Sequence, residues 1–190
     1  MSAVVGKEAG EVFNKYYDLI SQESDRGAVI LAGSILDSGL KKLLQKRLVE
    51  PTKSEDSLFK TFGPLDTFDA KIEMSFRLGL IKINIRDQLL KFKSIRNDFA
   101  HNIETSDLSN NKNTSRLLEI LKDTPDISYA FLEIIKQNKS LAVETKCKHH
   151  ELLKGYGHRN TFDLLFSLLC MLIERVRFDF DKIEVYESEG

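Results

Sequence analysis

Residues 95 to 102 read IRNDFAHN and place a guanidinium, an amide and an imidazole close together on the chain, at Arg96, Asn97 and His101. The planar donor set of an arginine matches carboxylates and phosphates. A histidine changes its charge near neutral pH and can give or accept a proton. This short stretch is therefore either the polar end of a helix or a site at which an anion is bound and a proton is moved.

A helical wheel separates the two faces of this segment. At 100° per residue, one arc of a helix over 85–101 is apolar, and it is made of Ile85, Leu89, Phe92, Ile95 and Phe99. Arg96 falls at the edge of this arc, and Asp98 points to the far side. Lys93, Asn97 and His101, at i, i+4 and i+8, form a stripe beside Arg96.

An arginine next to the core needs a carboxylate, a phosphate or water to answer its charge. Asp37 is the nearest candidate, because it lies at the margin of the apolar stripe expected on the preceding long helix. One interpretation is thus structural: Arg96 bridges to Asp37, and His101 is a cation favoured by the helix dipole.

The remaining elements are also expected to be helical. Apolar spacing and breaker residues predict helices over 7–22, 26–49 and 85–101, and another from an Asp66 N-cap to about Gly79. Weaker helices are expected within 114–139, and a strongly periodic one over 162–180. The polar segment 104–113 is expected to be a mobile loop, and Gly33 within its apolar stripe indicates a close helix crossing. No segment is typical of a strand, so we expect one all-α domain over residues 1–190.

Composition narrows the class of protein. The 28 Lys and Arg residues balance 29 Asp and Glu residues, so no overall basic field for nucleic acid is present. Residues 82–96 are locally basic and the last twelve residues are acidic. Two cysteines and no leader-like N-terminus predict a reducing, cytoplasmic setting. The apolar run LLFSLLCMLI, at 164–173, is too short for a membrane span and predicts a buried or interface helix.

A second polar cluster, CKHHE, contains Cys147, His149, His150 and Glu151. A zinc site would need a second ligand pair at a familiar spacing, which is absent. We interpret the basic segment 146–159 as a solvated loop, which would be suited to RNA contact. No phosphate loop or nucleophile motif is present, so the sequence predicts no cofactor and no metal.

The sequence IRNDFAH resembles the R-N-x-x-x-H motif of the HEPN superfamily of small helical proteins, many of which are metal-independent endoribonucleases. The longer stretches DRGAVILAGSILDSGLKKLL and FGPLDTFDAKIEMSFRLGLI, followed by IRNDFAHN, resemble the mannitol operon repressor family, which is similar in fold to HEPN domains. The resemblance covers residues 26–103 and does not extend into 114–190. It implies a bundle of four or five helices that is usually dimeric.

If the HEPN resemblance extends to activity, Arg96 and His101 are catalytic, Asn97 and Asp37 support them, and Lys93 binds the substrate. RNA, with tRNA as one candidate substrate, would then be cleaved by its own 2′-hydroxyl, and a homodimer would supply the second histidine that acid and base catalysis require. A toxin or defence role with an antitoxin partner would follow. The alternative is a non-catalytic regulator like the mannitol operon repressor. Because no helix-turn-helix with a basic recognition helix is present, it would act by binding another protein.

Overall fold

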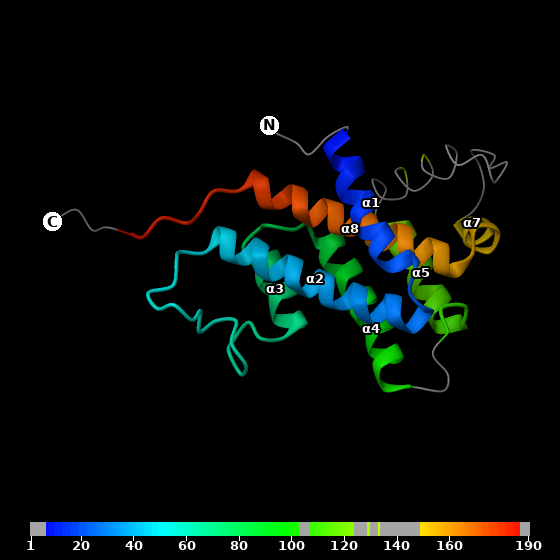
Figure 1. The fold of residues 1–190 in the computed structure, drawn as a ribbon, viewed down its shortest axis with the longest axis horizontal. Coiled ribbons are helices and arrows are strands. Elements are labelled where there is room, and N and C mark those ends of the chain that lie inside the picture. The colour runs from blue at the N-terminus through cyan, green and yellow to red at the C-terminus, as the bar shows by residue number, and fades with distance from the viewer. Residues whose placement is uncertain (1–6, 103–106, 124–128, 130–132, 134–148, 187–190) are drawn as a thin grey trace.

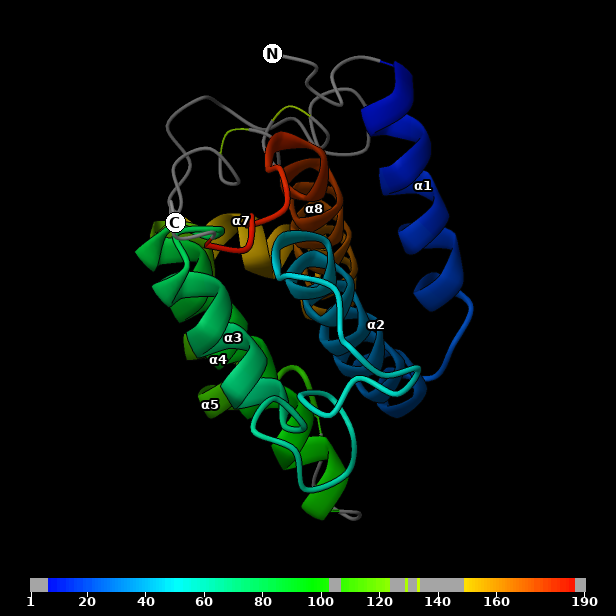
Figure 2. The same cartoon turned by 90° about the vertical axis from the view of Figure 1, so that its left-hand side faces the viewer.

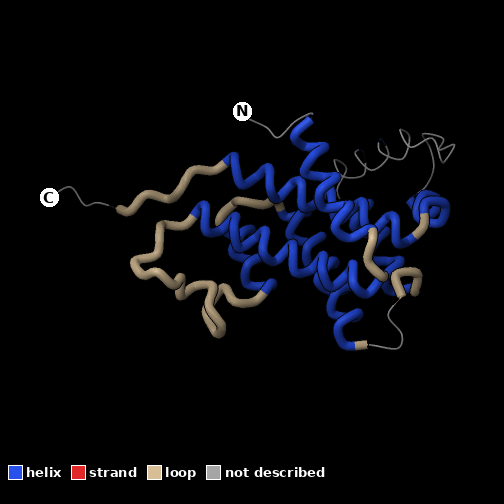
Figure 3. Tube along the Cα trace, viewed as in Figure 1, coloured by secondary structure: helices blue, strands red, loops and turns tan. Residues whose placement is uncertain are grey.

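A computed structural model describes residues 7–102, 107–123, 129, 133 and 149–186. Within these residues all regular secondary structure is helical (Figure 3), which confirms the predicted all-α class. The helices are α1 (Lys7–Ser21), α2 (Asp25–Arg47), α3 (Phe68–Arg77), α4 (Ile83–His101), α5 (Asn111–Asp123), α7 (His149–Tyr156) and α8 (His158–Asp179).

The two longest helices, α2 and α8, lie side by side at the centre of the molecule (Figures 1 and 2). The first helix, α1, packs mainly on α8, whereas α3 and α4 pack on α2 and on each other. The short helix α7 and α5 close one end of the bundle against α8. Helix α2 therefore has α8 on one side and the pair α3 and α4 on another.

The apolar stripes predicted for the second and fourth helices are buried as expected. The α2 stripe is Val29, Ala32, Gly33, Leu36, Leu40 and Leu43, and the α4 stripe is Ile85, Leu89, Phe92, Ile95 and Phe99. Helix α2 begins after Ser24, whose hydroxyl accepts a hydrogen bond from the Gly27 amide at 3.1 Å, and it ends shortly before Pro51. These stripes fix which face of α4 is left for function.

Helix α8 is buried along most of its length. Every residue from Thr161 to Cys170 is buried, which confirms that the apolar run belongs to a core helix. The helix begins at His158, four residues before the predicted start, because Arg159 is bound to the buried Asp163 at 2.9 Å and to Asp25 at 2.9 Å. No helix in the described part of the chain has the length and apolar character of a membrane span.

Three local predictions are corrected. The N-cap of α3 is Thr67, whose hydroxyl accepts from the Ala70 amide at 3.2 Å, and not Asp66. The carboxylate of Asp66 instead accepts from the Phe62 amide at 3.0 Å. Residues 111–113 of the expected loop are helical, and 149–156 form α7 rather than a loop. Residues 103–106 and 146–148, and most of 124–139, lie outside the described part.

Candidate functional site

A polar cleft of about 440 Å³ lies between α2, the start of α3 and α4. Its lining residues include four of the five side chains that the sequence singled out, namely Asp37, Lys93, Arg96 and Asn97. Gly33, Ser34 and residues 66–69 complete its wall. The buried stripes of α2 and α4 produce this arrangement, because they set the polar flanks of both helices beside each other.

The contact between Gly33 and Arg96 forms the floor of the cleft. A Cβ atom at Gly33 would lie 2.8 Å from Cγ of Arg96, which no ordinary packing allows, so a glycine is needed for α4 to approach this closely. This confirms the close crossing predicted from Gly33. The stem of Arg96 lies on α2, and its exposed guanidinium donates to Oδ1 of Asn97 at 3.1 Å.

Asp37 does not pair with Arg96, so the predicted bridge is wrong. The Nζ of Lys71 donates to both carboxylate oxygens of Asp37, at 2.7 and 3.0 Å, and to the carbonyl of Asp66 at 2.7 Å. The Lys71 side chain is only 4% exposed. The sequence reasoning missed Lys71, although a lysine next to Ile72 on the buried face of a helix needs a carboxylate for the same reason as Arg96.

Most of the positive charges at the cleft form ion pairs with its own carboxylates. Lys93 forms an ion pair with Asp69, and Lys71 pairs with Asp37. Arg96 has no carboxylate within ion-pair distance among the described residues. The lining has three acidic side chains, at 37, 66 and 69, and two cations, Lys93 and Arg96, while the buried Lys71 contacts Asp37 from outside the lining, so the cleft has no excess of positive charge.

His101 lies apart from the cleft. It is exposed at the last position of α4 and is not among the residues that line the cleft. The reason is geometric: eight residues turn a helix by about 80° beyond two full turns, so a stripe at i, i+4 and i+8 drifts around the axis. Lys93 and Asn97 reach the cleft, but His101 has rotated away from it.

Asp98 is on the opposite flank of α4, as predicted. Its carboxylate accepts hydrogen bonds from Arg116 at 2.6 Å and from Lys112 at 3.1 Å, both on α5. Burial alone would raise the pKa of Asp98, but the hydrogen bonds from these two cations lower it below its ordinary value. This contact fixes α4 against α5 and takes no part in the cleft.

The second polar cluster is only partly described. His149 and His150 begin α7, and His158 contacts the Thr114 hydroxyl at 3.0 Å, whereas Cys147 lies outside the described residues. Cys170 is buried in α8. In the ranges that the structure describes, no group of three or more His, Cys, Asp or Glu residues is arranged to hold a metal ion.

The fold and the cleft define an all-α bundle with a charge-balanced polar cleft between its second and fourth helices. No protein-family model and no curated protein matches the sequence. Among solved structures, the fold is similar to that of YggD from Shigella flexneri 2a str. 2457T, a possible transcriptional regulator, with a TM-score of 0.58 and 15% identity. The similarity covers 85% of this chain and 97% of YggD. At this identity it shows a shared fold alone.

Proposed function

We propose that this chain is a non-catalytic transcriptional regulator that acts by binding another protein. The observation that carries the proposal is the composition of the cleft, in which Lys71 and Lys93 are paired with carboxylates and which His101 does not line. The description of YggD as a possible transcriptional regulator supports the same class. The resemblance of residues 26–103 to the mannitol operon repressor family agrees with it.

The charge balance argues against the cleft as a site for a nucleic-acid backbone. Phosphate contacts depend on lysines and arginines that are free to replace condensed counterions. Lys71 and Lys93 are already paired, with Asp37 and Asp69, and only Arg96 remains. An RNA strand would therefore gain one guanidinium contact, and it would have to displace two ion pairs to contact the lysines.

An exposed aromatic side chain next to the cleft supports protein binding. Phe62 is 97% exposed and has a φ of 64°, a backbone conformation that is uncommon for a residue with a side chain. The turn is held by hydrogen bonds from the Phe62 amide to Asp66 and from the Gly63 amide to the Lys60 carbonyl at 2.7 Å. Buried Phe59 anchors the same loop. A rigidly presented aromatic ring is suited to a pocket in a partner protein.

Asp66 joins this loop to the cleft. Its carboxylate holds the Phe62 amide, and its carbonyl accepts from Lys71, which holds Asp37. The loop and the cleft are therefore one hydrogen-bonded unit. We infer that the partner protein contacts both, with Phe62 as the apolar anchor and Arg96 as the polar contact at the centre of the face.

Transcript profiling of the producing organism tests the proposal. Strains would carry a deletion, the wild type, Phe62→Asn, Arg96→Ala, or Leu19→Asn as a control, since Leu19 is also an exposed apolar residue and lies on α1, away from the cleft. Asparagine tolerates a positive φ, so Phe62→Asn removes the ring without new strain. We expect Phe62→Asn and Arg96→Ala to reproduce the deletion profile and Leu19→Asn to match the wild type.

An RNA cleavage assay with the purified protein can refute the proposal. The wild type would be incubated with tRNA and with total RNA in the presence of EDTA, which chelates metal ions and so inactivates contaminating metal-dependent nucleases. We expect no cleavage. Cleavage that disappears in His101→Ala would overturn the regulator proposal, as would a Phe62→Asn strain whose transcripts match the wild type.

A second candidate is the metal-independent ribonuclease of HEPN type, as a toxin or defence effector. The observation in its favour is that Arg96 is exposed, lacks a carboxylate partner in the described part of the chain, and shares α4 with the exposed His101. A homodimer would have to bring the His101 of a second copy to the cleft, with Asn97 and Asp37 supporting and Lys93 binding RNA. An antitoxin would be its protein partner.

Two variants separate this candidate from the first. Arg96→Ala and His101→Ala should each abolish RNA cleavage while leaving the melting temperature within a few degrees of the wild type, because both side chains are exposed. Mixing the two inactive variants should restore part of the activity if the site is shared between two copies, since one site of the heterodimer is then intact. A monomeric wild type in solution would refute this candidate.

A further inference from the structure

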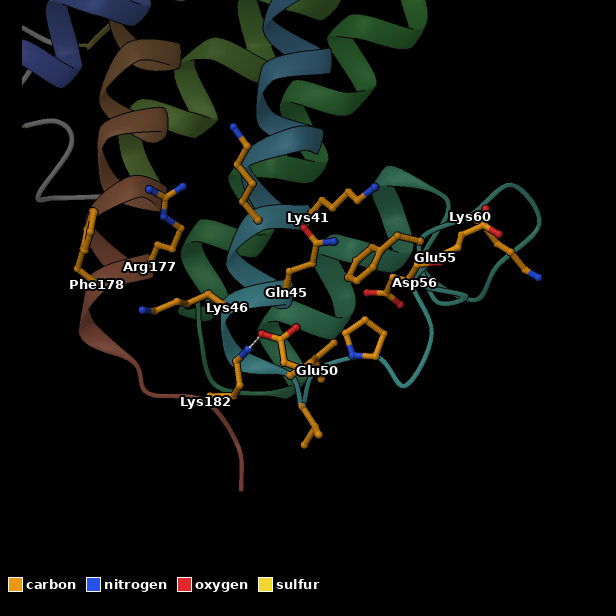
Figure 4. Close-up of a pocket in the computed structure, with 16 residues that line it drawn as sticks. Lys41, Gln45, Lys46, Glu50, Glu55, Asp56, Lys60, Arg177, Phe178 and Lys182 are labelled. Atoms are coloured by element: carbon orange, nitrogen blue, oxygen red, sulfur yellow. Dashed lines mark hydrogen bonds and ion pairs between the residues drawn. The ribbon is translucent and has the colours of Figure 1, made fainter. Parts of the chain in front are cut away.

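A second cleft, of about 860 Å³, lies at the C-terminal end of α2. It is bounded by the last two turns of α2, the loop that follows to Lys60, and the end of α8 with the residues after it (Figure 4). The amide of Ile183 donates to the Arg47 carbonyl at 2.8 Å, which holds this terminal segment beside α2. Three segments distant in the sequence therefore form its walls.

Unlike the first cleft, this cleft has an excess of positive charge. Its lining contains six basic residues, namely Lys41, Lys42, Lys46, Lys60, Arg177 and Lys182, and three acidic ones, Glu50, Glu55 and Asp56. Six against three leaves an excess of three positive charges, in a chain whose formal net charge is −1. An excess of one sign in a concave site attracts ligands of the other sign.

Most of these cations have no carboxylate partner. Within the described residues, Lys182 pairs with Glu50 and Arg177 pairs with Glu174 at 3.1 Å, whereas the four lysines on α2 and the loop have none. Figure 4 shows Lys46 extending from α2 toward the side of the cleft on which Arg177 and Lys182 lie. Lys46 from α2, and Arg177 and Lys182 from the end of α8 and the residues after it, thus line one corner of the cleft.

Apolar surface accompanies the charges. Phe178, beside Arg177, is 61% exposed, and the guanidinium of Arg177 lies 5.3 Å from the centre of its ring. On the other side, the ammonium of Lys41 lies 5.6 Å from the ring centre of Phe59. The cleft therefore offers an organic group apolar contacts next to the cations.

We propose that this cleft binds a small phosphorylated organic molecule, with its phosphate at the corner formed by Lys46, Arg177 and Lys182. A phosphate ester carries up to two negative charges and a diphosphate about three, which matches the local excess. Ammonium and guanidinium donors both suit phosphate oxygens. Lys182 would exchange its contact with Glu50 for the phosphate, and Phe178 would contact the organic part.

The volume and the arrangement of the cations favour a small ligand over a macromolecule. Small-molecule sites commonly enclose about 300–1,000 Å³, and this cleft is within that range. A nucleic-acid duplex is contacted by cations spread along its backbone. Here Lys46, Arg177 and Lys182 line one corner of a concave site, from two of its walls. This site is separate from the first cleft and does not depend on the function proposed above.

Calorimetric titration of the full chain with pyrophosphate and with ADP tests the site. We expect both to bind at low salt and to bind more weakly as salt rises from about 50 to about 500 mM. Lys46→Gln should weaken binding about tenfold, as expected for the loss of a hydrogen bond to a charged group. Lys46 is exposed and has no structural partner among the described residues, so the variant should fold.

The control is Lys122→Gln, which removes the same charge from an exposed position on α5 that does not line the cleft. It should leave the affinity for ADP unchanged. The proposal is overturned if neither probe binds, or if Lys122→Gln weakens binding as much as Lys46→Gln. It is also overturned if an oligoglutamate peptide or a short DNA duplex binds the cleft and ADP does not, since the occupant would then be a macromolecule.

Discussion

Replacing Lys71 by methionine tests the central contact of the first cleft. The lysine makes three hydrogen bonds, two to Asp37 and one to the Asp66 carbonyl, from a side chain that is 4% exposed. Loss of one partner of a buried ion pair costs about 3–5 kcal/mol. The Asp37 carboxylate left behind is 36% exposed and can be hydrated, so the lower end, about 3 kcal/mol, applies to Lys71→Met.

The opposite change, Asp37→Ala, should cost more. It leaves a largely buried ammonium with the Asp66 carbonyl as its remaining acceptor, so the upper end of the range, about 5 kcal/mol, applies. For a chain of this size, about 3 kcal/mol corresponds to a fall of roughly 6–12 °C in melting temperature. Urea unfolding followed by circular dichroism measures both free energies of unfolding.

Lys93→Met is the matched control. Its pair with Asp69 joins side chains that are 28% and 51% exposed, and an exposed pair contributes about 1 kcal/mol or less. The expected order of destabilisation is Asp37→Ala, then Lys71→Met, then Lys93→Met. If Lys71→Met and Lys93→Met lower the free energy of unfolding by the same amount, the assignment of Asp37 to a buried structural pair is refuted. Asp37 would then be a free carboxylate at the site.

Three further predictions concern α4. Arg96→Ala should lower the free energy of unfolding by less than about 1 kcal/mol in a thermal melt, because its guanidinium is exposed; a loss of about 3 kcal/mol would indicate a buried bridge. Gly33→Ala should cost about 1–3 kcal/mol, since its Cβ would meet Arg96 Cγ at 2.8 Å, and a double-mutant cycle should show that Arg96→Ala relieves this cost. Asp98 has a folded-state pKa below its ordinary 3.8, so the stability it adds is present above pH 3.8 and is lost as the pH falls through the folded value. Acid titration of unfolding should therefore show a smaller loss below pH 4 in Asp98→Asn, and parallel curves for the two proteins would contradict this.

The helices and their buried faces could be predicted from the sequence, because spacing alone sets which residues of α2 and α4 face the core. Gly33 also indicated correctly that another helix crosses close by, and the structure shows that this helix is α4. The same spacing placed Lys93, Arg96, Asn97 and Asp37 around one cleft, as the structure has them. Periodicity is a property of a single helix, and these predictions needed little more.

The pairing of charges could not be predicted, because it depends on how helices are placed relative to one another. Asp37 is within reach of two cations, and the position of α3 gives it to Lys71 rather than to Arg96. The N-cap was misplaced for a similar reason: Asp66 and Thr67 are both good caps, and the turn at Phe62 uses the Asp66 carboxylate. His101 was grouped with Asn97 because the two residues are four positions apart. Each step of four residues turns the helix slightly more than one full turn, so the third residue of such a stripe no longer faces the same side.

The turn that carries Phe62 has a consequence for how binding preference could change over evolution. Its shape is set by main-chain hydrogen bonds, by the Asp66 carboxylate and by buried Phe59, none of which requires an aromatic ring at position 62. The side chain there can be exchanged without repacking any helix. If a partner binds the turn as proposed, selection can alter what it recognises without a change in the packing of the bundle. The atoms that fix the shape of the turn are thus different from the side-chain atoms that would contact a partner.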